Sequence, residues 1–294
     1  MKSSWPDAWR LLRIPFSLFL MPIFWFALSA APEEVTFWRA AAVFLILHVL
    51  VYPASNGYNS YYDRDEGSIG GLKHPPQVTE SLYWLVLAFD VLAVVLSAFL
   101  SLPFALLVLV YLLVSKAYSY KGIRLKQYPL GSTLVVVIFQ GAFTFLMVQV
   151  GIGVSENTLW HTTNLLLALV SSLFLCGSYP LTQVYQHQED ARRGDRTLSL
   201  LLGINGTFLF AALSLLLATG LLLYTYWLRQ EQINSLFFLL CTFPVLAVFT
   251  WWVWQVRQSP TAASFENTMR MNKVSSLSMS LAFGLMLAWH FWAG

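Results

Sequence analysis

The chain has 294 residues, of which 57% are hydrophobic and only 11% are charged. Soluble domains carry about 25% charged residues, so this composition nearly excludes a soluble globular protein, and its high hydrophobicity excludes intrinsic disorder. Aromatic residues make up 16% of the chain, which is typical of lipid contact and of interfacial aromatic belts. We therefore expect an all-α polytopic membrane protein, formed as a single domain over residues 1–294, that does not bind nucleic acid.

Nine stretches are long enough to cross a bilayer, which requires about 20 mostly apolar residues. The first has basic residues before it but no small-residue cleavage site followed by a soluble domain, so we expect it to be retained as a helix. The predicted spans are residues 12–31, 36–55, 82–101, 103–119, 130–151, 160–183, 206–227, 235–256 and 275–292.

Positive residues gather on one side of these spans. The N-terminus and the loops after the even-numbered spans hold 15 of the 17 Lys and Arg residues, including Lys2, and the opposite side keeps only Arg39 and Arg229. Since Lys and Arg favour the cytoplasmic side, we expect the N-terminus in the cytoplasm and the C-terminus on the other side. Most acidic residues share the positive side, so we look for chemistry at the cytoplasmic end.

The first acidic cluster follows the second span and reads N-G-Y-N-S-Y-Y-D-R-D-E-G, from Asn56 to Gly67. Asn56, Asn59 and Asp63 are three and four residues apart, so they share one face if the helix continues past the membrane boundary. Their oxygens are too few to enclose a cation alone. Magnesium is usually held in this way, by one or two carboxylates together with water and substrate phosphates.

The second acidic cluster follows the sixth span and reads Y-Q-H-Q-E-D-A-R-R-G-D-R-T-L-S, from Tyr185 to Ser199. Gln186 and Asp190 are again four residues apart. If this cluster faces the first one, its acids would hold a cation while its arginines pair with phosphate oxygens. The alternative is a pair of solvated helix ends in contact with lipid headgroups, but two such clusters on one side favour a site.

The loop after the fourth span is basic and contains Lys121, Arg124 and Lys126. These side chains could contact a diphosphate. The alternative is a loop that only sets the membrane orientation and lies on anionic lipid.

Three motifs together resemble those of the UbiA superfamily of intramembrane prenyltransferases. The pattern N-x-x-N-x-x-x-D-x-x-x-G that ends at Gly67 is similar to the family's first aspartate-rich motif, and D-A-R-R-G-D-R-T-L-S-L-L-L-G, from Asp190 to Gly203, is similar to its second. The run Y-S-Y-K-G-I-R-L-K-Q-Y-P-L-G, which begins at Tyr118, resembles the family's loop after the fourth span. Gly67 stands where many members have another acid, which is closer to the naphthoate and chlorophyll branches than to the hydroxybenzoate branch.

The resemblance implies a nine-helix bundle with a central cavity that opens to the cytoplasmic side. It implies the Mg²⁺-dependent transfer of a prenyl group from a polyprenyl diphosphate to a small aromatic acceptor within the membrane lipid. The metal positions that match are Asn59, Asp63, Gln186, Asp190 and Asp195. The catalytic positions are Asp63, Arg64, Lys126 and Asp190. The substrate-binding candidates are His48, Asn56, Tyr118, Lys121, Arg124, Lys126 and Arg196. Acids that could substitute for missing motif positions are Asp65, Glu66 and Glu189.

Two other functions stay open at this point. A UbiA-like terpene cyclase would ionise the same diphosphate without an acceptor. An ion-coupled transporter would use the clusters as ion sites, but a conduction path should be lined more deeply, and only Asp90 lies inside a span. Asp90 could deprotonate an acceptor or bond to a neighbouring helix, and the same choice applies to His48 and Gln140 near midmembrane.

Overall fold

The computed structural model describes residues 4–293, without the side chains of Arg193 and Ala293. Lys2, which the sequence assigns to the cytoplasmic side, lies outside the described residues. Within the described part, the chain forms helices and connections with no β-strand, apart from one isolated bridge between Ile69 and Leu72. The predicted all-α fold is confirmed.

Nine helical spans within residues 4–293 are long and apolar enough to cross a membrane, and each overlaps one predicted stretch. The first span comprises α1 (Trp5–Leu11), η1 (Ile14–Leu20) and α2 (Met21–Ser29), and the second comprises α3 (Phe37–Leu45), η3 (Ile46–Val51) and α4 (Tyr52–Asp63). The third span is α5 (Glu80–Leu100) and the fourth is α6 (Leu102–Ser119). The fifth comprises α7 (Pro129–Val137), η5 (Ile138–Phe143) and α8 (Thr144–Ile152). The sixth span comprises α10 (Thr162–Leu181), η6 (Val184–Gln186) and α11 (His187–Arg193). The seventh, eighth and ninth spans are α12 (Leu198–Leu228), α13 (Gln232–Gln258) and α14 (Phe265–Ala293). Short turns in the connections are η2 (Pro32–Glu34), η4 (Leu125–Gln127), α9 (Glu156–Leu159) and η7 (Pro260–Ala262).

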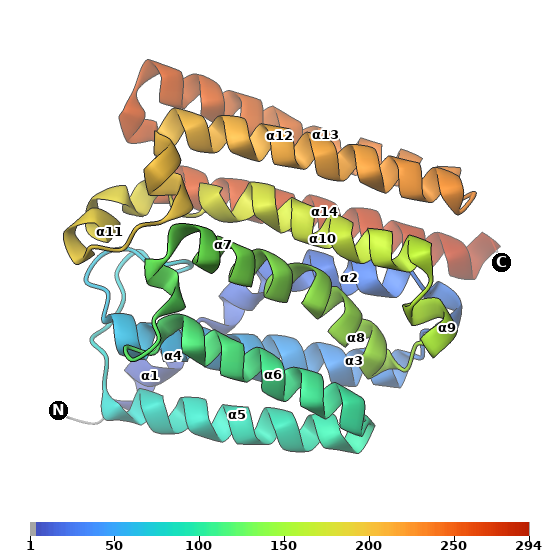
Figure 1. Cartoon of the computed structure of the whole chain (residues 1–294), viewed down its shortest axis with the longest axis horizontal. Helices are drawn as coiled ribbons and strands as arrows, with labels where there is room; N and C mark the ends of the chain where they lie inside the picture. Colours follow the sequence, from blue (N-terminus) through green and yellow to red (C-terminus); the bar gives the residue numbers. More distant parts are fainter. Residues whose placement is uncertain (1–3, 294) are drawn as a thin grey trace.

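The spans run side by side along the long axis of the molecule (Figure 1). In this view α12 and α13 form one edge of the bundle and α5 forms the other. The N-terminus, the long connection between α4 and α5, and α11 lie at the left-hand end, whereas the C-terminus lies at the right-hand end. Because the number of spans is odd, the two termini lie at opposite ends of the bundle.

Several spans begin at side chains that cap the helix. Ser101 accepts a hydrogen bond from the backbone N–H of Phe104 at 3.3 Å at the start of α6. Thr197 accepts one from Leu200 at 3.2 Å at the start of α12. Such caps satisfy backbone N–H groups that have no partner within the helix, so these residues determine where the chain turns back into the bundle.

Several helices extend well beyond the predicted apolar stretches, including α12, which begins at Leu198, eight residues before the predicted start at residue 206. The second span continues to Asp63, the sixth continues through η6 into α11, and α14 begins at Phe265, ten residues before the predicted start at residue 275. The prediction was too short in each case because hydropathy marks only the part of a helix that lies in hydrocarbon. These extensions carry the polar residues of the acidic clusters and the polar first turns of α14.

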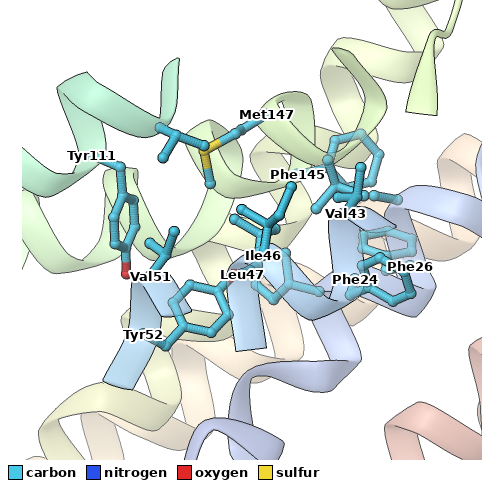
Figure 2. Close-up of a cluster of buried hydrophobic side chains, with 14 of the residues drawn as sticks. Phe24, Phe26, Val43, Ile46, Leu47, Val51, Tyr52, Tyr111, Phe145 and Met147 are labelled. Atoms are coloured by element: carbon cyan, nitrogen blue, oxygen red, sulfur yellow. The ribbon is translucent and has the colours of Figure 1, made fainter. Parts of the chain in front are cut away.

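Buried apolar side chains from several spans hold the bundle together (Figure 2). Phe26 of α2 packs between Phe145 of α8, with ring centroids 5.2 Å apart, and Phe283 of α14, with centroids 4.4 Å apart. In lipid such contacts stabilise through van der Waals packing rather than through the hydrophobic effect. This cluster fixes α2 against α8 and α14 and leaves the space beside it as a cavity.

Candidate active site

A cavity of about 720 Å³ lies inside the bundle, and its charged lining residues gather at one end. Its polar lining residues there are Arg13, Asn56, Asn59, Asp63, Asp65, Lys126, Gln183, Tyr185, Gln186, Asp190, Asp195, Thr197 and Asn272. Most of the other lining residues are apolar or aromatic, among them Phe16, Phe19, Ile23, Phe26, Val136, Phe139, Phe174, Leu175, Phe238, Phe249, Met279 and Phe283. The cavity therefore suits a ligand with one charged end and one apolar end.

Asp63 is the last residue of α4 and lies at the polar end. Its Oδ2 accepts a hydrogen bond from Asn59 Nδ2 at 2.7 Å, one helical turn earlier, and its Oδ1 lies 2.5 Å from Lys126 Nζ. The side chains of Asp63 and Lys126 are only 7% and 12% exposed. The i,i+4 spacing seen in the sequence thus places the amide and the carboxylate on one face, where a buried lysine balances the charge.

The two acidic clusters lie against each other across the cavity. Lys126 Nζ is 3.7 Å from Asp195 Oδ2 as well as close to Asp63. Arg124 Nη2 contacts both carboxylate oxygens of Asp195, at 2.9 and 3.1 Å. The basic loop between α6 and α7 therefore bridges the end of the second span and the segment that follows the sixth.

Further polar contacts order the surroundings of Asp190. Thr197 Oγ1 is 3.5 Å from Asp190 Oδ2, and the hydroxyl groups of Tyr118 and Tyr179 lie 2.7 Å apart where both rings line the cavity. Gln186 donates a hydrogen bond from Nε2 to the backbone oxygen of Ser68 at 3.3 Å. These contacts tie α6, α10 and the loop after α4 to one site.

The donors at the polar end fit a hard cation. Asn59 Oδ1 is buried without a hydrogen-bond partner, next to the Asp63 carboxylate, so one ligand oxygen is left available. Within residues 4–293, no three His, Cys, Asp or Glu residues are grouped as a metal site. A set with few carboxylates and several amide oxygens suits Mg²⁺, which keeps waters and takes substrate phosphates as ligands, and does not suit Zn²⁺.

Arg13 is a site residue that the sequence analysis counted only as a determinant of orientation. It adopts a left-handed conformation, with φ 52° and ψ 42°, between α1 and η1. Its guanidinium donates hydrogen bonds to the backbone oxygens of Asn56 at 3.1 Å and Gly70 at 3.2 Å, and its Nε is buried without a partner. The only signal in the sequence is an arginine directly before Ile-Pro at the start of an apolar stretch.

Five predicted substrate-binding or catalytic residues do not line the cavity, and one of them is Arg124, which contacts Asp195 from the basic loop. Arg64, Lys121 and Arg196 are exposed side chains on the loops around its polar end. His48 is buried in η3, where its Nδ1 lies 3.0 Å from the backbone oxygen of Ser17 and its ring stacks on Phe44. Substrate-binding or catalytic roles for these five residues stay predictions.

Asp90 has a partner outside the cavity. Its carboxylate lies 2.6 Å from Lys116 Nζ on α6, and neither residue lines the cavity. This agrees with the expected alternative of an interaction with a neighbouring helix rather than with an acceptor. Gln140, by contrast, lines the cavity from η5.

Solved structures of other proteins share this fold. A digeranylgeranylglyceryl phosphate synthase is 17% identical to this chain, with 96% of this chain and 97% of that one covered and a TM-score of 0.61. A UbiA homologue from Archaeoglobus fulgidus, solved with GPP and Mg²⁺ bound, is 16% identical over 95% of this chain and 99% of that one, with a TM-score of 0.66. The same homologue with DMAPP and Mg²⁺ gives 16% identity, the same coverage and a TM-score of 0.65.

Family assignment rests on the sequence as well. Residues 19–274 match the UbiA prenyltransferase family, whereas no curated protein sequence gives a significant match. The match covers most of the chain and includes all three motifs recognised in the sequence. The predicted family, fold class and enzyme class are confirmed. This chain belongs to the UbiA prenyltransferase family and is a multi-pass integral membrane enzyme of that family.

Proposed function

We propose that this enzyme transfers the prenyl group of a polyprenyl diphosphate to a small aromatic acceptor and releases diphosphate with the help of Mg²⁺. The observation that carries the proposal is the cavity itself, in which carboxylates and cationic side chains gather at one end of a space whose other lining residues are mostly apolar or aromatic. In the reaction the donor C–O bond breaks and its electron pair leaves with the diphosphate. A carbon–carbon bond to the acceptor forms, and the acceptor loses one proton.

The polar end has the side chains that the leaving group needs. Asn59, Asp63, Gln186, Asp190 and Asp195 would hold Mg²⁺ there. The metal supplies positive charge that stabilises the departing diphosphate. Lys126 and Arg13 can donate to the diphosphate oxygens directly, and charge-assisted hydrogen bonds of this kind are the strong ones. Arg64, Lys121, Arg124 and Arg196 would raise the local positive potential around the same end.

The rest of the cavity suits the allylic part of the donor. The aromatic rings of Phe16, Phe139 and Tyr118 line it, and ring faces attract a cation through their quadrupole. Closely packed apolar walls also keep water away from a reactive carbon centre. The tail and the acceptor would share this apolar space.

We place the polar end of the cavity on the cytoplasmic side. The loops that surround it contain the Lys and Arg residues that favour the cytoplasm, so a diphosphate donor would enter from that compartment. The N-terminus lies on this side in our proposal, and the C-terminus lies on the other.

The test uses purified protein in detergent with geranyl, geranylgeranyl or longer diphosphates, with Mg²⁺ present or chelated. Aromatic acceptors are added one at a time, and lipid products are identified by mass spectrometry. We expect diphosphate release and a prenylated acceptor only when Mg²⁺ is present. Release without an acceptor would identify a terpene cyclase instead, and no release with any donor would favour the transporter.

Two substitutions test the site. We expect Asp63→Asn or Asp190→Asn to lower the rate by a factor on the order of 10²–10³, the size of effect seen when one group that stabilises developing charge is removed. Asp90→Asn is the matched control, because Asp90 is also an acidic residue within a span but does not line the cavity. Full activity in both site variants, with normal gel-filtration profiles, would contradict the assignment.

A further inference from the structure

The wall that the fifth span contributes to the cavity ends at an interrupted helix. The π-helical segment η5, between α7 and α8, contains Gly141, whose φ of −95° and ψ of −107° are not helical. An added Cβ at Gly141 would lie 2.5 Å from the Cα of Ser172 on α10, so the two helices are in close contact here. Among the described residues of this span, Gln140 is the last that lines the cavity. Short π-helical segments within helices are frequent at functional sites.

Three hydrogen bonds from side chains support the interruption. Ser172 donates from Oγ to the backbone oxygen of Val137 at 2.9 Å and accepts from the backbone N–H of Ala142 at 2.9 Å. Thr144 donates from Oγ1 to the backbone oxygen of Phe139 at 2.6 Å. Backbone groups that an irregular helix leaves without partners need such contacts inside a membrane. The neighbouring side chains therefore hold the interrupted segment in one conformation.

A tyrosine from the fourth span faces Gln140. Tyr111 of α6 is 4% exposed, lines the cavity and is a hydrogen-bonding neighbour of the Gln140 side chain. Tyr52 packs against Tyr111 with ring centroids 5.9 Å apart (Figure 2) but does not line the cavity. Tyr111 is the first described residue of α6 that lines the cavity. Because α6 runs toward the polar end and the fifth span runs away from it, Tyr111 and Gln140 form the limit of this wall opposite the polar end.

Other polar side chains that line the cavity beyond its polar end bond within their own helices. Ser171 donates to the backbone oxygen of Ala168 at 2.7 Å, and Thr242 donates to that of Phe238 at 2.8 Å. The amide of Gln140 differs, because it has two N–H donors and an oxygen that accepts. One neighbouring hydroxyl uses only part of this capacity, so the amide can also bind a ligand.

An oxygen-bearing ring suits this part of the cavity better than the prenyl tail does. Hydrocarbon packed against an amide leaves its polar groups without partners, which costs free energy. About 10 Å along α6, or two helical turns, separates Tyr111 from Tyr118, whose hydroxyl meets that of Tyr179 near the polar end. An acceptor ring that lies between the reacting carbon of the donor and Gln140 spans this depth.

We infer that Gln140 selects the acceptor, because its amide hydrogen-bonds to a hydroxyl or carbonyl oxygen on the side of the ring away from the carbon that is prenylated. This inference rests on the proposed function, which places the diphosphate at the polar end. Tyr111 orients the amide, and η5 fixes its position. The amide both donates and accepts, so it binds either kind of oxygen. No bond forms or breaks at Gln140, which acts on the choice of acceptor and not on the chemical step.

Binding of two naphthols tests this role without turnover. Purified protein in detergent is loaded with Mg²⁺ and a non-ionising geranyl diphosphate analogue, and equilibrium dialysis gives its affinities for 2-naphthol and 2,6-dihydroxynaphthalene. The second compound has one further hydroxyl on the ring away from the reacting carbon. We expect it to bind about 3–10-fold more tightly, the contribution of one neutral hydrogen bond. Equal binding of the two naphthols, or binding of neither, would overturn the inference.

Gln140→Leu should abolish the preference, so that the two naphthols bind equally. Because the comparison is between two ligands of the same protein, a general loss of folded protein does not change it. Thr242→Val is the matched control, since Thr242 also lines the cavity but its hydroxyl bonds within α13, and this variant should keep the preference. A preference that survives in Gln140→Leu, or that is lost equally in Thr242→Val, would contradict the role of Gln140.

Binding of the donor analogue separates this inference from the proposed function. Excess inorganic diphosphate should displace the analogue from the original protein and from both variants alike. If it does so while the naphthol preference is absent, only the role of Gln140 fails. If the analogue does not bind, or diphosphate does not displace it, the donor site fails and the role of Gln140 fails with it.

Discussion

At the scale of single residues, Lys126 is the counter-charge for the acidic groups at the polar end of the cavity. Its ammonium lies 2.5 Å from Asp63 and 3.7 Å from Asp195, and all three side chains are at most 12% exposed. Removing one partner from a buried ion pair leaves a charge that neither water nor a partner solvates, which costs far more than the pair itself contributes. Lys126 therefore has a structural role beside its proposed contact with diphosphate.

We expect Lys126→Met to lower the free energy of unfolding by on the order of 3 kcal/mol. Because the variant leaves two acids without their shared lysine, Mg²⁺ should raise its thermal midpoint more than it raises that of the original protein. The measurement is thermal unfolding in detergent with Mg²⁺ present or chelated.

Lys73→Met is the control for this prediction. Lys73 pairs with Glu266, but both side chains are more than half exposed, and such surface pairs contribute about 0–1 kcal/mol. Its midpoint should stay close to that of the original protein and should not gain sensitivity to Mg²⁺. Equal behaviour of the two variants would contradict the role of Lys126 as a buried counter-charge.

At the scale of elements, the motif that follows the sixth span ends at a glycine whose backbone conformation interrupts a helix. Gly203 has φ 66° and ψ 173° inside α12, where the helix is interrupted before its long transmembrane part. This region of conformational space is open essentially to glycine alone. The interruption lets the first turn of α12, capped by Thr197 beside Asp190, take a direction different from that of the span.

Gly203→Ala should cost about 1–3 kcal/mol of stability, the usual penalty for a strained backbone position, even though an added Cβ would meet no atom within 4 Å. Gly220→Ala in the same helix is the control, because an added Cβ there is also in open space and the backbone is helical. We expect that change to be neutral or stabilising by up to about 1 kcal/mol. Thermal unfolding of both variants is the measurement. A loss of stability in Gly203→Ala alone would show that backbone strain, and not a packing clash, causes the effect.

At the scale of the whole molecule, the distribution of basic residues and the position of the cavity's charged groups distinguish the same end of the bundle. The two arginines at the end opposite the site are engaged with the ends of helices. Arg39 donates to the backbone oxygen of Gly151 at 3.3 Å, and Arg229 donates to that of Ala30 at 2.8 Å. Basic groups at the C-terminal ends of helices satisfy carbonyls that lack partners. The other Lys and Arg residues within residues 4–293 belong to the segments at the site end, and the proposed orientation rests on them.

We expect a reporter fused after Gly294 to lie outside the cytoplasm, because the basic loops keep the other end of a nine-span bundle inside. Alkaline phosphatase fused there should be active in a bacterial host, and the same enzyme inserted into the basic loop after α6 should be inactive. The reverse pattern would contradict both the orientation and the cytoplasmic mouth of the cavity.

Much of the fold follows from local sequence. The thickness of the hydrocarbon layer sets the length of every span, and only a helix satisfies its own backbone there, so nine spans could be counted from hydropathy. The contact between Asn59 and Asp63 also followed, because residues four apart on a helix are neighbours. The positions at which the second and sixth spans end and the ninth begins did not follow from the sequence. Helices continue there into the headgroup region, where hydropathy does not mark their bounds.

The sequence by itself determined the number of spans, the charged end and the motif residues that belong there, because helical periodicity and the membrane act on each segment separately. Only the tertiary structure decided that Arg13 reaches the cavity, that Asp90 pairs with Lys116, and that His48 packs away from the cavity. It also decided that Phe26 and Phe283, from the first and last spans, stack on each other where both line the cavity. These features depend on which faces of distant helices meet, and apolar faces toward lipid, core and cavity have the same composition.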